Sequence, residues 1–348
     1  MSDVSAHRYL CVDAFMTDMA GATALSSAFE TGVIDHLAAQ PVCAVNTLQN
    51  ALQLDARGLD FLLGMLRANR VLTQGDGSVS LTPAFIAALE FRDLLEAKLY
   101  FAKLVAPDFI QLLSALLMAP ADFVEHARVF KLFSYQHAME ATPENLERTA
   151  RWMRLTTALT RYEAGACLAA FDFAKFQRVL DVGGNSGEFV LQLCRAHANL
   201  HAAVYDLPVV CEIGAAHVAD APEAPRIDFV KRDRAVRALP AGHDLVCFKS
   251  MLHDWPEAEM ADFLQRAFDA LQPGGTVMIF EREQWQMGDT PVAYGQLPLL
   301  LFFRSYRRPE VYEAQLSALG FVDVSVAHVA LDMPFILVTA VKPGRALS

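Results

Sequence analysis

The segment VLDVGGNSGEFVLQLCR, residues 179–195, contains residue types that can hold a ligand through the backbone. Glycine approaches a ligand closely and adopts positive φ, and Asn185 is one of the few other residue types that tolerate this conformation. The segment departs from the dinucleotide fingerprint G-x-G-x-x-G, because Asn185 and Glu188 occupy the second and third glycine positions counted from Gly183. Glu188 in a first helical turn would repel a phosphate, so the pattern favours a neutral or cationic ligand.

An acid follows at the end of the next expected strand. Asp206, in VYDLP, lies 23 residues after Gly183. An acid about 20 residues beyond the first glycine binds ribose hydroxyls in nucleotide-binding folds, although Asp206 as a mere cap of the next segment is the alternative. Asp181, Gly183, Gly187 and Asp206 together indicate a nucleoside without a pyrophosphate at the turn. S-adenosylmethionine is such a nucleoside.

His253 follows the apolar run at 244–250, in a position suited to proton transfer. A histidine with a pKa near ~6.5 can accept a proton from an attacking hydroxyl. In the alternative interpretation, HDWP is a strand-to-helix turn in which Asp254 caps the helix and His253 is structural. The dipeptides in GHD (242–244) and LHD (252–254) leave a metal open as a weaker alternative. We expect none, because no Cys/His cluster has zinc spacing.

Alternating strands and helices from residue 178 onward must position these residues. This alternation is typical of an α/β fold whose parallel sheet is covered on both faces. The short link at 331–334 predicts an antiparallel hairpin at one edge of the sheet. We expect strands at 178–182, 201–206, 227–230, 244–250, 276–281, 322–329 and 335–341.

The first hundred residues have a different pattern. Helical spacing of apolar residues predicts a helix over 22–38 and two helices over 47–72 broken near Leu54 and Asp55. The Gly-Asp-Gly turn within 73–83 predicts a hairpin, which completes a winged-helix pattern. Residues 84–177 are expected to be helical, with a long amphipathic helix at 151–171.

Charge and composition exclude several classes of function. The net charge is -11, and residues 1–100 hold six Lys and Arg against eleven Asp and Glu. The segment that would enter a DNA groove, ARGLDFLLGMLRANR, is apolar, so we expect no nucleic-acid partner and favour a dimerisation role. A ligand-responsive winged-helix regulator remains the alternative from another class.

The expected compartment is the cytoplasm. The N-terminus has no signal-peptide pattern, and the six cysteines form no CxxC pair and are expected to be free thiols. Charged and polar residues interrupt the apolar stretch from residue 101, so we expect no membrane span.

Four motifs in this order, LDVGGNSG, VYDLP, KSMLHDWPE and LQPGG, resemble the S-adenosylmethionine-dependent small-molecule O-methyltransferases of the plant caffeate and acetylserotonin type, which include bacterial natural-product enzymes. The resemblance covers nearly the whole chain. It implies a Rossmann-like class I methyltransferase domain, a mostly parallel seven-stranded sheet with an antiparallel edge, over 178–348. A helical winged-helix dimerisation domain over 1–100 and a helical linker or substrate-capping region over 101–177 would precede it. The resemblance also implies a homodimer through the N-terminal domain.

The resemblance further implies roles for single residues. His253 matches the general base, and Glu281 matches an acid that orients it. Tyr306 replaces a second acid of the family, which leaves a C- or N-methyltransferase of a natural-product, amino-acid-derived or tetrapyrrole acceptor as an alternative to hydroxyl methylation. The implied S-adenosylmethionine contacts, with S-adenosylhomocysteine as product, are Gly183, Gly187, Asp206, Asp233 at the adenine amino group, Arg234 against the ring, Lys249 and Trp255.

The acceptor is expected to be a small aromatic or conjugated molecule, bound in an apolar, aromatic pocket. The alternative for each candidate wall residue is a plain core position, which the sequence favours for any single one of them. The candidates are Trp152, Met153, Thr156, Phe302, Phe303 and Tyr306.

Overall fold

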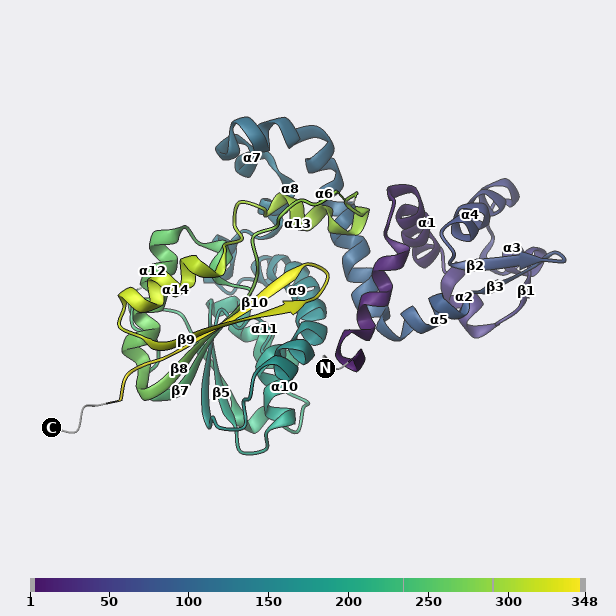
Figure 1. Cartoon of the computed structure of the whole chain (residues 1–348). Helices are drawn as coiled ribbons and strands as arrows, with labels where there is room; N and C mark the ends of the chain where they lie inside the picture. The colour runs from purple at the N-terminus through teal and green to yellow at the C-terminus, as the bar shows by residue number, and fades with distance from the viewer. Residues whose placement is uncertain (1–3, 234, 290, 345–348) are drawn as a thin grey trace. The chain divides into compact units, whose positions relative to one another are not determined.

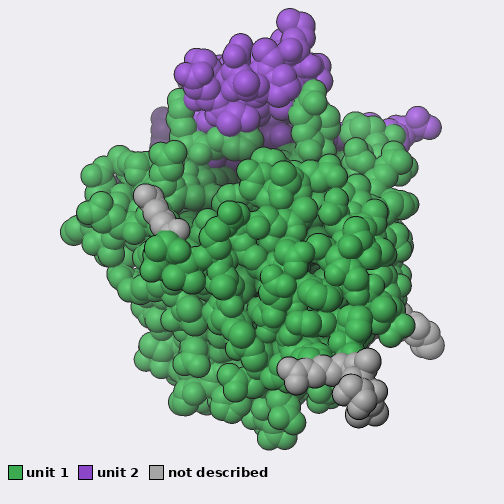
Figure 2. Space-filling view, turned by 90° about the vertical axis from the view of Figure 1, so that its left-hand side faces the viewer, with its two compact units in different colours: residues 1–7, 130–287, 302–348 green, residues 8–129, 288–301 purple. Residues whose placement is uncertain are grey.

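The computed structural model describes residues 4–233, 235–289 and 291–344. Contacts within the chain divide it into two compact units, coloured separately in Figure 2. Unit 1 takes in residues 130–287 and 302–348 with the N-terminal residues up to His7, and unit 2 takes in residues 8–129 and 288–301. The three-part division expected from the sequence stays a prediction.

The expected hairpin is present in unit 2. Strand β2 (Leu72–Gly75) pairs antiparallel with β3 (Ser78–Leu81). Its tight turn holds Asp76 at φ 49° and Gly77 at φ 73°, the left-handed conformation that matches the twist of a hairpin. A third strand, β1 (Cys43–Ala44), pairs with β3 and was not predicted, because two residues are too short to show a periodic pattern.

The helices of unit 2 follow the apolar periodicity with one correction. The single helix expected over 22–38 is wrong: Gly32 at φ 77° separates α1 (Met19–Glu30) from α2 (Val33–Ala39). The expected break near Asp55 is confirmed, because the Asp55 carboxylate caps α4 (Ala56–Ala68) by accepting the Gly58 N–H at 2.7 Å.

One stretch of unit 2, Pro83–Met118, is long and apolar enough to cross a membrane by length and composition, and 28% of its most apolar window is buried. The core helices of soluble proteins pass the same test. Two charged side chains within the stretch are buried and bonded inside unit 2. Lys98 pairs with Asp13 at 2.5 Å, and Asp108 accepts the Val129 N–H at 3.0 Å.

Most of the remaining helical elements of unit 2 are short, and two of them, η1 and α8, include residues of both units. They are η1 (Val4–Phe15), α3 (Val45–Leu52), α5 (Pro83–Ala88), η2 (Leu89–Phe91), α6 (Arg92–Met118), α7 (Pro120–His126), α8 (Arg128–Leu132), η6 (Tyr294–Gln296) and α13 (Leu297–Leu301), where η denotes a 3-10 helix.

Unit 1 is built on a seven-stranded sheet in the order β6-β5-β4-β7-β8-β10-β9 (Figure 1). The first five strands pair in parallel, and β10 pairs antiparallel with both β8 and β9. Each strand lies where the sequence predicts one, and the antiparallel edge is confirmed. The strands are β4 (Arg178–Val182), β5 (His201–Asp206), β6 (Ile227–Lys231), β7 (His243–Lys249), β8 (Leu271–Arg282), β9 (Val322–Ala330) and β10 (Pro334–Val341).

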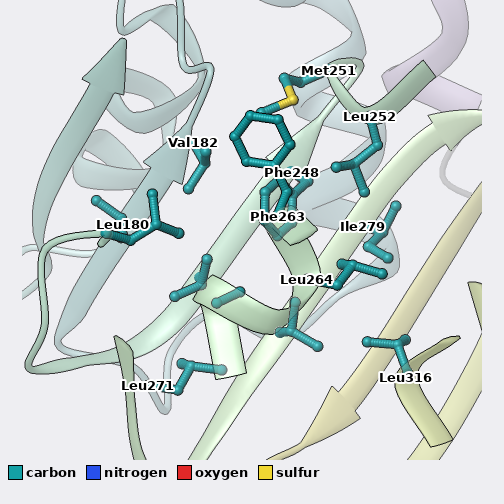
Figure 3. Packing of buried hydrophobic residues seen from close by; sticks show 14 of the residues in the cluster. Leu180, Val182, Phe248, Met251, Leu252, Phe263, Leu264, Leu271, Ile279 and Leu316 are labelled. Carbon is teal, nitrogen blue, oxygen red and sulfur yellow. The ribbon is translucent and has the colours of Figure 1, made fainter. Parts of the chain in front are cut away.

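Helices cover both faces of this sheet, because successive strand residues point to opposite sides. Leu180, Val246 and Ile279 pack in one core cluster with α12 (Glu257–Ala270) and α14 (Pro309–Ala318), part of which Figure 3 shows. Their neighbours Val179 and Leu245 pack in a second cluster with α9 (Pro143–Ala170) and α10 (Glu188–Ala196). The other helical segments of unit 1 are η3 (Tyr135–Met139), α11 (Pro208–Val218), η4 (Ala224–Arg226) and η5 (Leu252–Asp254).

The strand order reverses between β4 and β7. Ligands of open α/β sheets bind beyond the carboxyl ends of the strands at such a reversal. The glycine turn after β4, Asp206 at the end of β5 and the turn after β7 therefore meet at one edge of the sheet.

Candidate active site

The glycine turn has the backbone that its sequence predicts. Gly183 and Gly187 adopt φ of 71° and 74°, and Asn185 between them adopts φ 55°. A Cβ at Gly183 would collide with Cγ of Met251, and a Cβ at Gly187 would lie 2.8 Å from Cζ of Phe229. The turn therefore admits no side chain at either glycine.

Asp181 lies beneath this turn as an uncompensated acid. Its side chain is 1% exposed, and neither carboxylate oxygen has a hydrogen-bond partner among the described residues. Burial raises its pKa to about 7, although the charge of Lys249 opposes this shift. A Cβ at Gly184 would lie 2.6 Å from Oδ2 of Asp181, so the carboxylate directly adjoins the turn. A buried acid without a partner fits a ligand that carries a positive charge.

Glu188 has a different role from the one expected. It is buried, and its carboxylate bonds to His217 Nε2 at 2.7 Å and Gln192 at 2.8 Å, with Arg161 at 3.6 Å. These partners hold its pKa below the usual value in spite of burial. Because Glu188 is compensated by residues of α9, α10 and α11, its charge does not by itself exclude a phosphate. The preference for a neutral or cationic ligand over a phosphate therefore depends on Asp181 and Asp206.

Asp206 binds the backbone around the turn. Its Oδ2 accepts the Asn185 N–H at 2.8 Å, and its Oδ1 accepts the Leu207 N–H at 2.6 Å. Burial raises its pKa to about 6, against the effect of these two backbone donors. The carboxylate thus couples the end of β5 to the turn after β4.

Two cavities are both lined by Arg232 and Asp233. The larger, about 660 Å³, is also lined by Lys231 and by residues of η3. The smaller, about 310 Å³, is also lined by Trp255, whose ring lies 5.8 Å from the guanidinium carbon of Arg232. Asp233 and Trp255 thus adjoin one cavity, whereas Arg234 lies outside the described residues.

Lys249 is held in a buried ion network. Its Nζ lies 2.5 Å from Glu163 Oε2 and 3.3 Å from Thr160 Oγ1. The other oxygen of Glu163 accepts Arg282 Nη2 at 2.5 Å. Although Glu163 is buried, these two cations lower its pKa to about 2, so the network links α9 to β7 and β8 while charged.

His253 and Glu281 form a close pair at this edge of the sheet. Nδ1 of His253 lies 2.6 Å from Oε2 of Glu281, and Oε1 of Glu281 accepts the N–H groups of Met251 and Leu252 at 2.7 Å each. Burial opposes ionisation of Glu281, but the charge and hydrogen bond of His253 hold its pKa below the usual value. Burial also disfavours the imidazolium, yet Glu281 and Asp254 raise the pKa of His253. Because a carboxylate can only accept, Nδ1–H donates to Glu281, and Nε2 takes no part in this hydrogen bond.

The turn that carries His253 is fixed by its backbone. Ser250, at φ 50°, redirects the chain after β7, and Figure 3 shows Met251 and Leu252 packed in the core cluster that holds Phe248. Arg307 donates to the carbonyl of Leu252 at 2.9 Å and to that of Trp255. This clamp leaves the imidazole little freedom to move.

Two alternatives from the sequence are corrected here. Asp254 does not cap α12: the N-cap residue is Pro256, and the Asp254 carboxylate instead accepts the hydroxyl of Tyr135 at 2.6 Å. The alternative of a metal shared by the GHD and LHD segments is wrong, because His243 begins β7 and His253 follows its end. At 3.3 Å per strand residue, the two histidines are roughly 20 Å apart. No cluster of His, Cys, Asp or Glu arranged to hold a metal occurs within 4–233, 235–289 or 291–344.

The expected acceptor residues do not all lie together. Phe302 contacts Phe130 at a ring distance of 5.6 Å and Phe133 at 6.4 Å, and Phe133 lies 6.1 Å from Trp152. Tyr306 lies 5.5 Å from the His253 ring.

Three further candidates have other surroundings. Met153 shares a core cluster with Trp152, against which Phe133 packs. Phe303 packs under Arg304, and Thr156 accepts the Asn185 side-chain amide at 3.0 Å, beside the glycine turn.

Sequence reasoning missed three residues that shape the site: Tyr135, Glu163 and Arg307. Their partners lie 119, 86 and 52–55 residues away along the chain. No local motif marks such contacts, so no signal in one sequence could have found them.

Comparisons of this chain with a family model and with known proteins indicate the same family. A family model described as an O-methyltransferase domain matches residues 118–322. The 3-hydroxy-5-methyl-1-naphthoate 3-O-methyltransferase of Streptomyces sahachiroi is 32% identical over 261 residues, 74% of this chain and 72% of that protein. The acetylserotonin O-methyltransferase of Bos taurus is 34% identical over 167 residues, but the match spans 47% of this chain and 48% of that protein.

A solved structure extends the similarity to nearly the whole chain. The S-adenosylmethionine-dependent methyltransferase SibL, in its apo form, is 26% identical, with a TM-score of 0.63 over 92% of this chain and 96% of that one. The Rossmann-like fold, the family model and the relative that matches most of the chain agree. The chain therefore belongs to the O-methyltransferase family and is an S-adenosylmethionine-dependent enzyme.

Proposed function

We propose that this enzyme methylates a hydroxyl group on a small aromatic acceptor, with His253 as the general base and Glu281 as the acid that orients it. The observation that carries the proposal is the carboxylate of Glu281, which holds His253 Nδ1 at 2.6 Å while two backbone N–H groups hold its other oxygen. A base that is oriented by a fixed acid is the arrangement that proton-abstracting sites share.

The residues of the glycine turn fit S-adenosylmethionine. Gly183 and Gly187 would cradle it, the unpartnered Asp181 would compensate its positive charge, and Asp206 would bind its ribose hydroxyls. Asp233, Trp255 and Arg234 would adjoin the adenine end, and Lys249 would lie beneath the site within its ion network. When bound, S-adenosylmethionine supplies a methyl group made electrophilic by a sulfonium.

His253 takes the acceptor proton in this mechanism. Its Nδ1–H stays donated to Glu281, so the lone pair of Nε2 faces the acceptor hydroxyl and receives its proton as the oxygen attacks. The imidazolium that results is stabilised by Glu281. Such general base catalysis contributes roughly 10²–10⁴-fold to the rate.

The aromatic side chains near His253 favour a flat acceptor. Phe302 and Trp152, both of which contact Phe133, would form one wall, with Tyr306 beside the imidazole. Met153, Thr156 and Phe303 would contribute less directly. The two relatives are named for a hydroxynaphthoate and for acetylserotonin, both of which are aromatic.

Unit 2 supports a homodimer. Nine of the twelve large hydrophobic side chains that are exposed in the described chain belong to it, Phe61 and Val42 each at 71%. A second copy of this unit would cover such surface. Light scattering after gel filtration tests this, and a monomer at micromolar concentration contradicts it.

The free cysteines fit a cytoplasmic enzyme.

The reaction is tested by incubating the purified enzyme with methyl-labelled S-adenosylmethionine and a panel of phenols that includes 3-hydroxy-5-methyl-1-naphthoate and N-acetylserotonin. Each phenol is paired with the analogue that lacks the hydroxyl. Mass spectrometry and NMR should locate the label on oxygen, with no label on the paired analogue. Label on carbon or nitrogen contradicts hydroxyl methylation.

A further inference from the structure

The hydroxyl of Tyr135 donates a hydrogen bond to Oδ2 of Asp254 at 2.6 Å. Tyr135 belongs to η3, far from the sheet in sequence, and Asp254 directly follows His253. The ring of Tyr135 packs on Trp152 at 5.8 Å and 70°, so its position is fixed by α9. The hydrogen bond thus connects the helical segment before α9 to the turn that carries the proposed base.

The other oxygen of Asp254 faces the free nitrogen of that base. Oδ1 of Asp254 lies 3.5 Å from Nε2 of His253, on the opposite side of the ring from Glu281. The imidazole therefore lies between two carboxylates. Tyr306 occupies the place of the second acid expected from the family resemblance. Asp254 instead provides a second carboxylate beside His253, from a position that the resemblance does not predict.

Tyr135 is chemically suited to hold this carboxylate. Burial and the charge of Asp254 keep the pKa of the phenol well above its usual value, so it remains a donor. The Asp254 side chain is 26% exposed, so without Tyr135 it can turn toward solvent.

We propose that Tyr135 is a positioning residue, which holds the Asp254 carboxylate beside Nε2 of His253 and so stabilises the imidazolium that forms when the acceptor loses its proton. This inference rests on the proposed role of His253. As a positioning residue, Tyr135 would act through Asp254 and not by contact with the transferred methyl group or the reacting oxygen.

Several charged groups face the imidazole and must be considered in any test. Glu281 and Asp254 favour its protonated form, and Arg282, next to Glu281 on β8, disfavours it. The Tyr306 ring packs on the imidazole, and the phenol of Tyr135 acts through Asp254. Loss of the Tyr135 hydroxyl either frees Asp254 to move away or favours its neutral form. Both changes make the imidazolium form of His253 less stable and so lower the pKa of His253.

The test compares Tyr135→Phe, Asp254→Asn and the double variant, with Tyr100→Phe as matched control, because Tyr100 is an exposed phenol of unit 2. The histidine rings are labelled with ¹⁵N and titrated by NMR without any acceptor, and His253→Ala identifies the resonance of His253. In the parent protein His253 should titrate above the ordinary histidine value. Its midpoint should fall in Tyr135→Phe and in Asp254→Asn, and stay unchanged in Tyr100→Phe.

Kinetics give the second measurement, with 3-hydroxy-5-methyl-1-naphthoate or the panel phenol that the enzyme methylates. We expect kcat to fall roughly 10-fold in Tyr135→Phe, the typical effect of losing one hydrogen bond to a charged group. The double variant should match Asp254→Asn alone, because the two residues act as one unit. Additive losses, or an unshifted or raised titration midpoint in Tyr135→Phe, overturn the inference. Full activity of His253→Ala instead overturns the base assignment itself, so the two failures are distinguishable.

Discussion

His253 and Glu281 are 28 residues apart in sequence, yet Nδ1 of one lies 2.6 Å from Oε2 of the other. The parallel pairing of β7 with β8 produces this proximity, because Lys249 near the end of β7 is in register with Phe280. The turn after β7 then places the imidazole over Glu281, which is fully buried. The geometry of adjacent parallel strands thus assembles the proposed base and its orienting acid.

Replacement of His253 by Ala should lower turnover on a phenolic acceptor by at least about 10²-fold, the lower range for loss of a general base. Affinity for S-adenosylmethionine, measured by calorimetry, should stay nearly unchanged, because the glycine turn is on another strand. Unchanged turnover contradicts the assignment of the base.

Glu281→Gln keeps the size of the side chain and removes its charge. We expect a loss of roughly 10²-fold in kcat, because the amide can donate to Nδ1 and so reverse the tautomer of His253. Glu283→Gln, two residues along the chain, is the matched control and should retain activity. Parent-like kcat in Glu281→Gln contradicts an orienting role.

Asp206→Ala should weaken binding of S-adenosylmethionine. The change removes the proposed ribose ligand and also leaves the N–H groups of Asn185 and Leu207 without their acceptor. Calorimetry on this variant and on Asp220→Asn, an exposed position two residues beyond the end of α11, measures the effect. Equal affinities in both variants contradict the role of Asp206.

Gly183→Ala should disrupt the turn, because Gly183 has φ 71° and its Cβ would collide with Met251. We expect a lower Tm and loss of measurable binding of S-adenosylmethionine. Gly165→Ala in α9 is the matched control: its Cβ meets open space, so stability should rise by about 0.5–1 kcal/mol. Parent-like affinity in Gly183→Ala rules out close approach of the cofactor to this backbone.

Asp181 should make the ligand-free enzyme less stable at high pH. Its pKa of about 7 lies above the unfolded value of about 3.9. The folded state therefore holds a proton that the unfolded chain releases, and the stability this contributes is complete below the unfolded pKa and lost as the pH rises through about 7.

The Tm of Asp181→Asn should consequently exceed that of the parent at pH 8, and the difference should narrow at pH 5. Thermal unfolding at both values measures this, with Asp220→Asn as an exposed control. A difference of equal size at both pH values shows that Asp181 does not titrate in this range.

The sequence by itself determined the elements and the chemistry that one chain segment can carry. Seven strands could be predicted because apolar runs bounded by turn residues report directly on backbone conformation. The left-handed Asn185 and the hairpin turn at Asp76 were predictable from residue type, because asparagine, aspartate and glycine tolerate positive φ. The break between α1 and α2 was not, because a single glycine inside an apolar pattern does not reveal its φ.

The tertiary structure alone decided which side chains meet. Tyr135 reaches Asp254, Glu163 joins Lys249 to Arg282, and Glu188 turns to His217, all across many residues of chain. Such contacts depend on how helices pack on the sheet, and local propensity carries no information about that packing. The same reason explains why Asp254 resembles a helix cap in the sequence but binds a tyrosine in the fold.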